Sequence, residues 1–292
     1  MRQKQVLITG GQGYIARNLV PLFINAGYTV DAPSRTEMDL LNPERVEEYL
    51  IKSNPDVIIH AATKGGKRNG KDTWEDVFVP NMTMFENLYR CTMKSELDNV
   101  KVIVISSGAE FDRRYPIHRR FEETAKYSWP IDPYGLSKNL ITRRCHEDLD
   151  NMWVVRLFGC FNFDDDPSRF IKNGILNLKR GLPVTVHQNR EMDFFYLDDV
   201  FIVMDYIINA HPNRIVPQDI NLVYDKKLTL LDIATLIHKH CQKFEPTIKM
   251  VDAGLGDPYT GDGYFINQMQ SSGKFKLLGL EEGIRRTILK LT

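Results

Sequence analysis

The sequence lacks the features that mark several protein classes. No apolar run approaches the roughly 18–20 residues needed to cross a bilayer, and the N-terminus carries no signal-peptide pattern. The four cysteines show no C-x-x-C spacing, which favours reduced thiols over disulfides or a metal site. Lysine plus arginine equals aspartate plus glutamate at 38 each, so charge points to neither nucleic acid nor an anionic membrane. We expect a cytoplasmic protein without a metal.

Strand-like and helical patterns alternate along the first half of the chain. The strand-like runs cover residues 5–10, 28–33, 56–62, 100–107 and 152–159. The helical patterns cover residues 14–27, 43–53, about 76–95 and 134 to about 148. Alternation of this kind predicts an α/β protein with a parallel sheet that is covered by helices on both faces.

A glycine-containing turn, TGGQGYIA at 9–16, joins the first strand to the first helix. Gly10 permits a tight turn, Gly13 lets the backbone approach a pyrophosphate, and Ala16 is small enough for close helix–strand packing. The residues of this turn expected to bind a dinucleotide are Gly10, Gln12, Gly13, Tyr14 and Ile15. The context predicts a doubly wound Rossmann domain at this end of the chain.

The chain is long enough for two lobes. We expect residues 1–160 plus about 198–222 to form the dinucleotide-binding Rossmann domain. The pattern becomes irregular after Phe161, so residues of about 161–197 and 223–292 are expected to form a smaller α/β substrate-binding lobe.

The end of the second strand bears on the choice of cofactor. NAD sites usually place a carboxylate there for the ribose hydroxyls, whereas this chain has Ser34 followed by Arg35. A hydroxyl beside a guanidinium can bind a 2′-phosphate, so NADP is favoured and NAD is possible. Two alternatives stay open: Arg35 is a solvated loop cation, or the strand ends earlier and Asp31 is the acid.

DPYGLSK at 132–138 places Tyr134 four positions before Lys138. On a helix these side chains lie on one face, roughly 5–6 Å apart at Cβ. A cation near a phenol lowers the pKa of the phenol, which makes Tyr134 a candidate proton donor near neutral pH. An incidental surface pair is the alternative when these two residues are taken alone.

Four motifs occur in the order of one known family: the glycine turn, SSG at 106–108, YGLSK at 134–138 and DFFYLDDV at 193–200. The chain resembles the extended short-chain dehydrogenase/reductases, the NAD-dependent epimerase/dehydratase family, over nearly its whole length. Within that family, the segments 34–42, 56–66 and 81–88 are most similar to GDP-L-fucose synthases, and dTDP-4-dehydrorhamnose reductases are close. The resemblance implies reduction of a 4-keto nucleotide sugar.

The resemblance also implies roles for individual residues. Tyr134 would protonate the C-4 oxygen of the sugar, and Lys138 would lower the pKa of Tyr134 and bond the nicotinamide ribose. Ser107 precedes Phe111 by four positions, so it is the third catalytic hydroxyl and Ser106 the spare. The remaining cofactor contacts would be Ser34, Arg35, Asp39, Leu40, Ala61, Ala62, Thr63 and Asn81, with a simple buried amide as the alternative for Asn81. The substrate contacts would be Lys64, Ser107, Gly108, Ala109, Arg169 and Arg190.

Departures from the family pattern narrow the reaction. Dehydratases of the family carry Thr-Asp-Glu where this chain has Ser107, Gly108 and Ala109, so 4,6-dehydration is disfavoured. The cysteine and histidine of 3,5-epimerising relatives correspond to Ala109 and Arg169, although a shifted alignment would bring in His187. Asp198 and Asp199 are interpreted as residues of a helix N-terminus, not as metal ligands.

The leading hypothesis is NADPH-dependent reduction at C-4 of a nucleotide-diphosphate 4-keto-6-deoxyhexose or a related heptose, without 3,5-epimerisation. The alternatives are an NAD-dependent 4-epimerase and a non-catalytic cofactor-binding scaffold. The helices at about 76–95 and 134–149 pair across a dimer interface in this family, so the resemblance implies a homodimer.

Overall fold

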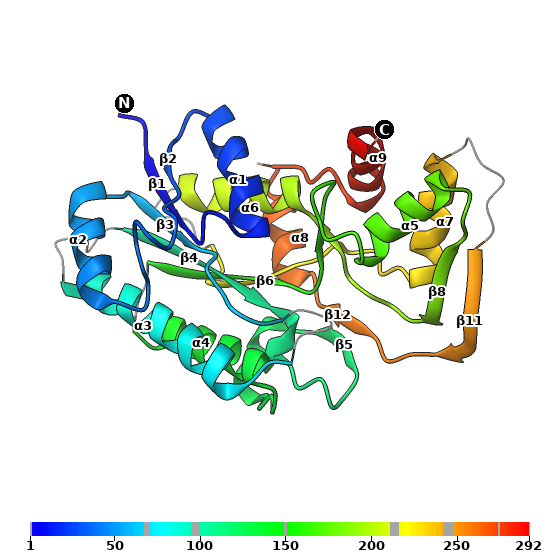
Figure 1. Cartoon of the computed structure of the whole chain (residues 1–292), viewed down its shortest axis with the longest axis horizontal. Coiled ribbons are helices and arrows are strands. Elements are labelled where there is room, and N and C mark those ends of the chain that lie inside the picture. Colours follow the sequence, from blue (N-terminus) through cyan, green and yellow to red (C-terminus); the bar gives the residue numbers. More distant parts are fainter. Residues whose placement is uncertain are drawn as a thin grey trace. The chain divides into compact units, whose positions relative to one another are not determined.

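The computed structural model describes residues 2–66, 71–94, 100–148, 151–210, 216–241, 248–273 and 275–291. The chain divides into two compact units (Figure 1). Unit 1 comprises residues 1–113, 122–156 and 204–220, and unit 2 comprises residues 114–121, 157–203 and 221–292. Assignment of the cofactor to one unit and the sugar to the other stays a prediction.

Unit 1 is built on one sheet of six strands, in the order β10-β6-β4-β3-β1-β2. The strands are β1 (Gln5–Thr9), β2 (Thr29–Asp31), β3 (Val57–His60), β4 (Lys101–Ser107), β6 (Met152–Leu157) and β10 (Asp219–Leu222). The β1–β2, β1–β3 and β3–β4 pairs are all parallel. The predicted α/β fold with a parallel sheet is therefore confirmed. Several strands are shorter than expected: β2 ends at Asp31 and not at Pro33, β3 ends at His60 and not at Ala62, and β6 ends at Leu157 and not at Gly159.

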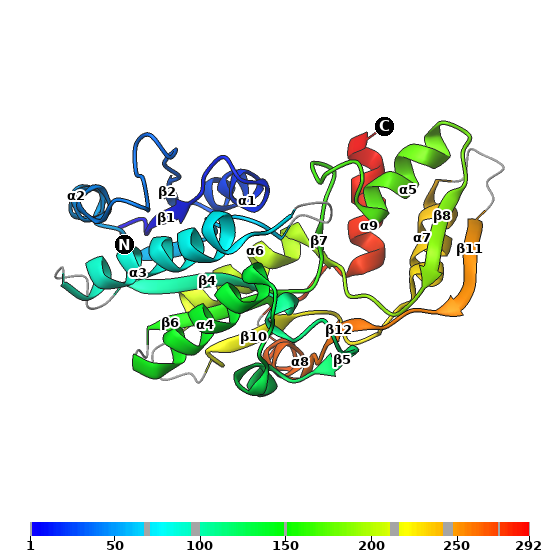
Figure 2. The ribbon, with the colours of Figure 1, turned by 60° about the horizontal axis from the view of Figure 1, so that its bottom comes forward.

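Helices cover both faces of this sheet. They are α1 (Tyr14–Asn25), α2 (Pro43–Ser53), α3 (Val79–Lys94), α4 (Pro133–Asp148) and the end of α6 (Leu197–Asn209). A buried cluster joins α2, α3 and α4 to one face of the sheet through side chains such as Leu50, Phe85, Ile141 and Val104. Figures 1 and 2 show α1 on the opposite side of the sheet from α3 and α4.

Local signals in the sequence locate several helix ends. The Asn42 side chain accepts a hydrogen bond from the Arg45 N–H at 2.9 Å, so Asn42 caps α2 as expected, with Pro43 in the first turn. Gly27 follows α1 with a φ of 90°, a conformation that glycine adopts without strain. A π-helical turn over Trp74–Phe78 precedes α3, so this helical segment begins slightly before the expected position.

Unit 2 contains three two-stranded parallel sheets and several helices. The strand pairs are β8 (Val184–Asn189) with β11 (Ile248–Leu255), β5 (Ile117–Arg120) with β12 (Tyr259–Gly261), and β7 (Cys160–Phe161) with β9 (Phe195–Tyr196). The helices are α5 (Phe170–Lys179), α7 (Leu230–His240), α8 (Tyr264–Ser271) and α9 (Leu280–Leu291). Residues from α5, α7, α9 and β8, among them Ile175, Ile233, Ile284 and Val186, form its buried cluster.

Asp198 and Asp199 lie in the first turn of α6, as the sequence predicted. Asp199 has a second role that the sequence did not reveal. Its fully buried carboxylate accepts hydrogen bonds from the Tyr224 hydroxyl and from the N–H groups of Leu278 and Gly279, at 2.7 and 3.0 Å for the two N–H groups. These hydrogen bonds hold the segment before α9 against the first turn of α6.

No helix among the described residues is both long and apolar enough to span a bilayer.

We predict that Asp199→Ala lowers the free energy of unfolding by about 3 kcal/mol, because three buried donors lose an ionised acceptor. Asp198→Ala is the matched control, since Asp198 shares the helix turn but is partly exposed, with one hydrogen bond from the Tyr196 hydroxyl and a long contact of 3.9 Å to Arg286. The control loses no more than about 1 kcal/mol. Urea denaturation measures both, and equal losses would contradict the anchoring role of Asp199.

Candidate active site

The centre of the site lies where β1 and β3 end. The chain leaves β1 for β2 on one side and continues to β3 on the other, which is the topological switch point where open α/β sheets bind ligands. Thr9 and His60 are the last residues of these strands, and Thr9 Oγ1 lies 3.0 Å from His60 Nδ1. Thr9 Oγ1 also accepts the N–H of Ala62 at 3.1 Å. These contacts hold the ends of β1 and β3 together at the centre of the site.

The glycine turn has the geometry of an anion-binding helix start. Gly10 has a φ of 71°, and a Cβ there would lie 2.8 Å from the Cα of Ala62, so this position requires glycine. Gly13 begins α1 without a side-chain cap, and the first turn of α1 holds no acidic residue. The positive end of the helix dipole therefore has no side-chain anion within that turn. Ala16 is buried against the sheet, as expected.

Gly11 is a requirement that the sequence analysis missed. A Cβ at this position would lie 2.3 Å from the Ala32 carbonyl oxygen, so the turn could not pass this close to the end of β2 with any other residue. Each of the three glycines of the turn is thus needed for a different reason. Gln12, Tyr14 and Ile15, the other predicted cofactor contacts, lie at the same helix start.

The loop after β2 brings Ser34 and Arg35 together with two carboxylates. The backbone N–H and the hydroxyl of Ser34 both donate to Glu37 Oε2, each at 2.7 Å. These bonds lower the pKa of Glu37. The guanidinium of Arg35 is exposed and lies 3.5 Å from Asp39 Oδ2. Glu37 was not among the expected site residues, and it uses the donors of Ser34 that we assigned to a ligand.

The neighbouring residues of this loop are held by the fold. Leu40 is buried, and its carbonyl accepts a hydrogen bond from the side chain of Asn87 at 2.9 Å. β2 ends at Asp31, the alternative acid, whose two carboxylate oxygens each lie 2.8 Å from the Tyr49 hydroxyl. Asp31 therefore lies at the position where an NAD site usually has its carboxylate. This carboxylate accepts a hydrogen bond from the Tyr49 hydroxyl.

The segment from Ala61 to Lys64 follows β3 and is fastened by Asn81 of α3. The Asn81 amide accepts the Lys64 N–H at 2.8 Å and donates to the Lys64 carbonyl at 3.0 Å and to Ser137 Oγ at 3.2 Å. Thr63 Oγ1 lies 3.5 Å from the same amide oxygen. Asn81 is almost fully buried, as the buried-amide alternative expects, and direct contact with a cofactor stays a prediction.

The three predicted catalytic residues lie together in unit 1. Ser107 ends β4, and its hydroxyl hydrogen bonds to the Tyr134 phenol near the start of α4. Ser107 Oγ also accepts the Ala109 N–H at 3.2 Å. Ser106 is bonded instead to the buried Glu110 carboxylate, because successive strand residues point to opposite faces. The geometry favours Ser107 over Ser106 as the partner of Tyr134.

The protonation of Tyr134 differs from the expectation. Burial raises its pKa above the ordinary value, while the hydrogen bond from Ser107 and the nearby Arg113 guanidinium act to lower it. Lys138 is not the cation that does so: its Nζ donates to the Ile105 carbonyl at 2.9 Å and lies 5.9 Å from the centre of the tyrosine ring. The expected acidic phenol, made so by Lys138, is therefore wrong for this structure.

Lys138 and His60 form a buried pair of bases beside the phenol. Burial lowers the pKa of Lys138 to about 8, although the Glu110 carboxylate acts in the opposite direction. Burial and the Lys138 charge lower the pKa of His60 to about 3, so His60 is neutral near pH 7. Lys138 is then the cation of the pair at neutral pH.

Two glycines allow other segments to approach the phenol closely. A Cβ on Gly135 would lie 2.5 Å from the Ala109 carbonyl oxygen, so glycine lets α4 reach the turn after β4. A Cβ on Gly66 would lie 2.8 Å from the Tyr134 Cζ, and Gly66 has a φ of 71°. The Gly66 N–H donates to Asp72 Oδ2 at 3.0 Å, which holds Gly66 in place beside the ring.

The other expected residues lie in various surroundings. Gly108 and Ala109 are buried in the short turn after β4, and Phe111 is a core residue with the Arg156 guanidinium 5.4 Å from its ring centre. Arg169 and Arg190 belong to unit 2, so their substrate contacts stay predictions. His187 lies on β8. In the part of the chain that the structure describes, no group of three or more His, Cys, Asp or Glu side chains could hold a metal ion.

Comparison with known proteins identifies the family of this chain. The model of the NAD dependent epimerase/dehydratase family matches residues 6–222, a span that contains the glycine turn and the Ser107, Tyr134 and Lys138 trio. The chain belongs to this family. The predicted resemblance is thereby confirmed, and the chain is a member of a family of NAD-dependent enzymes.

Individual relatives and solved structures match different shares of the chain. A GDP-L-fucose synthase from Azorhizobium caulinodans is 34% identical over 37% of this chain, and the match spans only 34% of that protein's length. A GDP-L-colitose synthase from Yersinia pseudotuberculosis is 23% identical over 80% of this chain and 81% of the relative. The crystal structure of dTDP-4-dehydrorhamnose reductase from Bacillus anthracis, in complex with NADP, has a TM-score of 0.80 at 18% identity and covers 99% of both chains. This last similarity shows a shared fold.

We predict that Gly66→Ala lowers the rate of cofactor turnover at least about tenfold, because the new methyl group displaces the Tyr134 ring from Ser107. Gly181→Ala is the matched control, since Gly181 has the same φ of 71° and a methyl group there would meet no atom within 4 Å. In both variants, alanine with a positive φ costs about 1–2 kcal/mol of backbone strain. Steady-state rates and unfolding curves distinguish the two effects, and equal rates in both variants would exclude the clash.

Proposed function

We propose that this protein is an NADPH-dependent reductase that acts on the C-4 keto group of a nucleotide-diphosphate sugar, a 6-deoxyhexose or a related heptose. The observation that carries the proposal is the hydrogen bond between Ser107 and Tyr134 at the carboxyl end of the sheet, with Lys138 buried beside it. The family match and the reductase and synthase relatives support the choice of reaction.

Each residue of the candidate site has its own role in carbonyl reduction. When bound, the nicotinamide supplies the hydride that the C-4 carbon receives. The Tyr134 phenol gives its proton to the C-4 oxygen, so that the ketone becomes an alcohol. Ser107 orients the phenol, and the charge of Arg113 offsets the negative charge left on Tyr134. Burial of Tyr134 keeps the phenol protonated until the substrate oxygen accepts the proton.

The cofactor would lie across the switch point between β1 and β3. The N-terminus of α1 suits the pyrophosphate, and Gly10, Gly13 and the backbone of residues 61–63 line its path. NADPH is preferred to NADH because Arg35 is an exposed cation with only a long contact to Asp39. Its guanidinium is therefore available for a 2′-phosphate.

The substrate would enter over the turn after β4 and contact Ser107, Gly108 and Ala109. Neither Gly108 nor Ala109 has a side chain that transfers protons, so dehydration and epimerisation at neighbouring carbons are disfavoured. Lys64, Arg169 and Arg190 would neutralise the diphosphate of the sugar nucleotide.

A homodimer through α3 and α4 is part of the same proposal. Within one chain these two helices are in contact, because the Arg144 guanidinium of α4 lies 4.5 Å from the centre of the Tyr89 ring of α3.

A 4-epimerase that uses NAD is the second candidate. The position of Asp31 at the last residue of β2 favours it, since this is where an acid bonds the ribose of NAD. The Tyr49 hydroxyl lies 2.8 Å from both oxygens of that carboxylate and donates its one hydrogen to it. A 4-epimerase would co-purify with NAD and would consume no added cofactor, whereas the proposed reductase oxidises added NADPH.

We predict that Tyr134→Phe lowers the rate of NADPH oxidation with 4-keto nucleotide sugars about 10²–10⁴-fold, because the general acid is lost. NADPH affinity should change by no more than about threefold, as one hydrogen bond at most is affected. Stopped-flow absorbance and fluorescence titration measure the two quantities. Undiminished turnover would remove Tyr134 from the mechanism, and a wild-type protein that binds NADPH without turnover would support the scaffold alternative.

We predict that Arg35→Ala weakens NADPH binding about 10–100-fold, the range expected for the loss of hydrogen bonds to a charged group. NADH binding should change by less than about threefold, since NADH has no 2′-phosphate. Arg45→Ala serves as the control, because Arg45 is an exposed cation on α2 that pairs with Glu48 at 3.7 Å. Titration with both cofactors tests this, and equal losses would refute the role of Arg35.

A further inference from the structure

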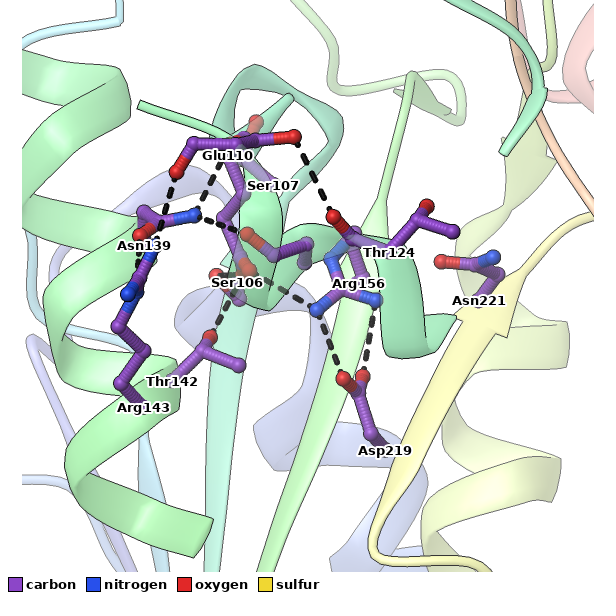
Figure 3. A network of polar contacts seen from close by, with 12 residues as sticks. Ser106, Ser107, Glu110, Thr124, Asn139, Thr142, Arg143, Arg156, Asp219 and Asn221 are labelled. Atoms are coloured by element: carbon purple, nitrogen blue, oxygen red, sulfur yellow. Dashed lines mark hydrogen bonds and ion pairs between the residues drawn. The ribbon is translucent and has the colours of Figure 1, made fainter. Parts of the chain in front are cut away.

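Glu110 lies three residues after Ser107 and is completely buried. Its carboxylate accepts hydrogen bonds from Ser106 of β4, from Thr142 Oγ1 of α4 at 2.7 Å and from Arg156 of β6 at 2.9 Å (Figure 3). One side chain therefore joins the strand that ends in Ser107, the helix that carries Tyr134 and Lys138, and the next strand of the sheet.

The backbone of Glu110 strengthens the same connection. Its carbonyl accepts the Asn139 side-chain amide at 3.1 Å, and that amide also donates to the Ala125 carbonyl at 2.8 Å. Asn139 directly follows Lys138 on α4. The turn after β4 is thus bonded to α4 through both the side chain and the main chain of Glu110.

Arg156 is bonded to a second carboxylate besides that of Glu110. Asp219 of β10 binds it through two contacts, from Nη1 to Oδ1 at 2.8 Å and from Nη2 to Oδ2 at 2.9 Å. One guanidinium therefore contacts two carboxylates, those of Asp219 and Glu110. Glu110 adds a further buried negative charge on the side of the catalytic residues, and burial of an extra charge is costly unless it balances another.

Lys138 is the charge that Glu110 balances. The titratable groups that face Lys138 are Glu110 from the turn after β4, Tyr134 and Cys145 from α4, and His60 from β3. Burial keeps the Cys145 thiol and the His60 ring neutral, since it raises the pKa of Cys145 and lowers that of His60 to about 3. Tyr134 is also neutral before reaction, because burial raises its pKa. Glu110 is the carboxylate among these four groups, and it acts to raise the pKa of Lys138.

We propose that Glu110 is a positioning residue of the active site, which holds the Ser107 turn in register with α4 and places a buried carboxylate on the face of α4 that carries Lys138. This inference rests on the proposed function for the roles of Tyr134 and Lys138. It assigns to Glu110 a part that neither the motifs nor the comparisons indicate.

Glu110→Gln tests the proposal because it keeps the shape of the side chain and removes the charge. Without the carboxylate, the charged form of Lys138 is less favourable, so its pKa falls below about 8. We expect the alkaline limbs of NADPH affinity and of kcat/KM to move to lower pH by about one unit. At pH 8 we expect kcat to fall about tenfold, with a smaller loss at pH 6.

Asp219→Asn is the matched control. It removes a buried carboxylate from the same guanidinium, so it should destabilise the fold to a similar extent. Asp219 pairs with Arg156 and with His146, which lies further along α4 than Lys138. The alkaline limb of this variant should coincide with that of the wild type. If Glu110→Gln and Asp219→Asn give the same pH profile, Glu110 is a structural residue only and the proposal is wrong.

Thr142→Val supplies a second test that changes no charge. It removes the α4 hydroxyl that donates to Glu110, so kcat should fall about threefold to tenfold while the alkaline limb stays in place. An unchanged kcat would contradict the positioning role, even if Glu110→Gln does not fold. NADPH affinity against pH needs no sugar substrate, so it tests this inference even where turnover fails. Absence of turnover with normal NADPH binding would count against the proposed reaction and not against the role of Glu110.

Discussion

The hydrogen bond between Ser107 and Tyr134 is the contact on which the candidate site depends. It joins the carboxyl end of a central strand to the first turn of α4, two elements that the chain brings together only through the fold. Glycine at position 135 permits the approach, because any Cβ would meet the Ala109 carbonyl. Reactive geometry of this kind is held best when the groups stand on rigid elements and not on loops.

Burial sets the protonation of the groups around this bond. Desolvation disfavours charge, so Tyr134 and His60 are neutral and Lys138 has a pKa of about 8. A neutral phenol is the form that can donate a proton to a substrate oxygen. The cation that would stabilise the resulting negative charge is Arg113. Exclusion of solvent therefore sets the protonation states in the site as much as the identity of its residues does.

Much of this arrangement could be predicted from the sequence because its signals are local. The glycine turn, the Asn42 cap and the helix of Tyr134 and Lys138 each depend on residues a few positions apart. The parallel sheet follows from the alternation of strands and helices. Ser107 could be chosen over Ser106 only through its spacing to Phe111, and the geometry agrees because neighbouring strand residues face opposite ways.

The parts that could not be predicted depend on contacts between distant residues. Glu110 and Arg156 are 46 positions apart, and Arg156 and Asp219 are 63 apart, so no local pattern indicates their ion pairs. The contact between Ser34 and Glu37 is local, and the run SRTE contains a hydroxyl three residues before a carboxylate; this signal was available. The higher pKa of Tyr134 arises from burial, which the i, i+4 spacing to Lys138 does not report.

The most direct test of the central claim is the fate of the cofactor hydrogen. NADPH that carries deuterium at the transferable C-4 position should be incubated with a panel of 4-keto nucleotide sugars, and the products analysed by NMR. The account predicts one deuterium at C-4 of a reduced sugar, with one NADP⁺ formed for each product molecule. A 4-keto sugar that is recovered unchanged with no net oxidation of the cofactor, together with inversion at C-4 of a 4-hydroxy nucleotide sugar supplied in its place, would contradict it.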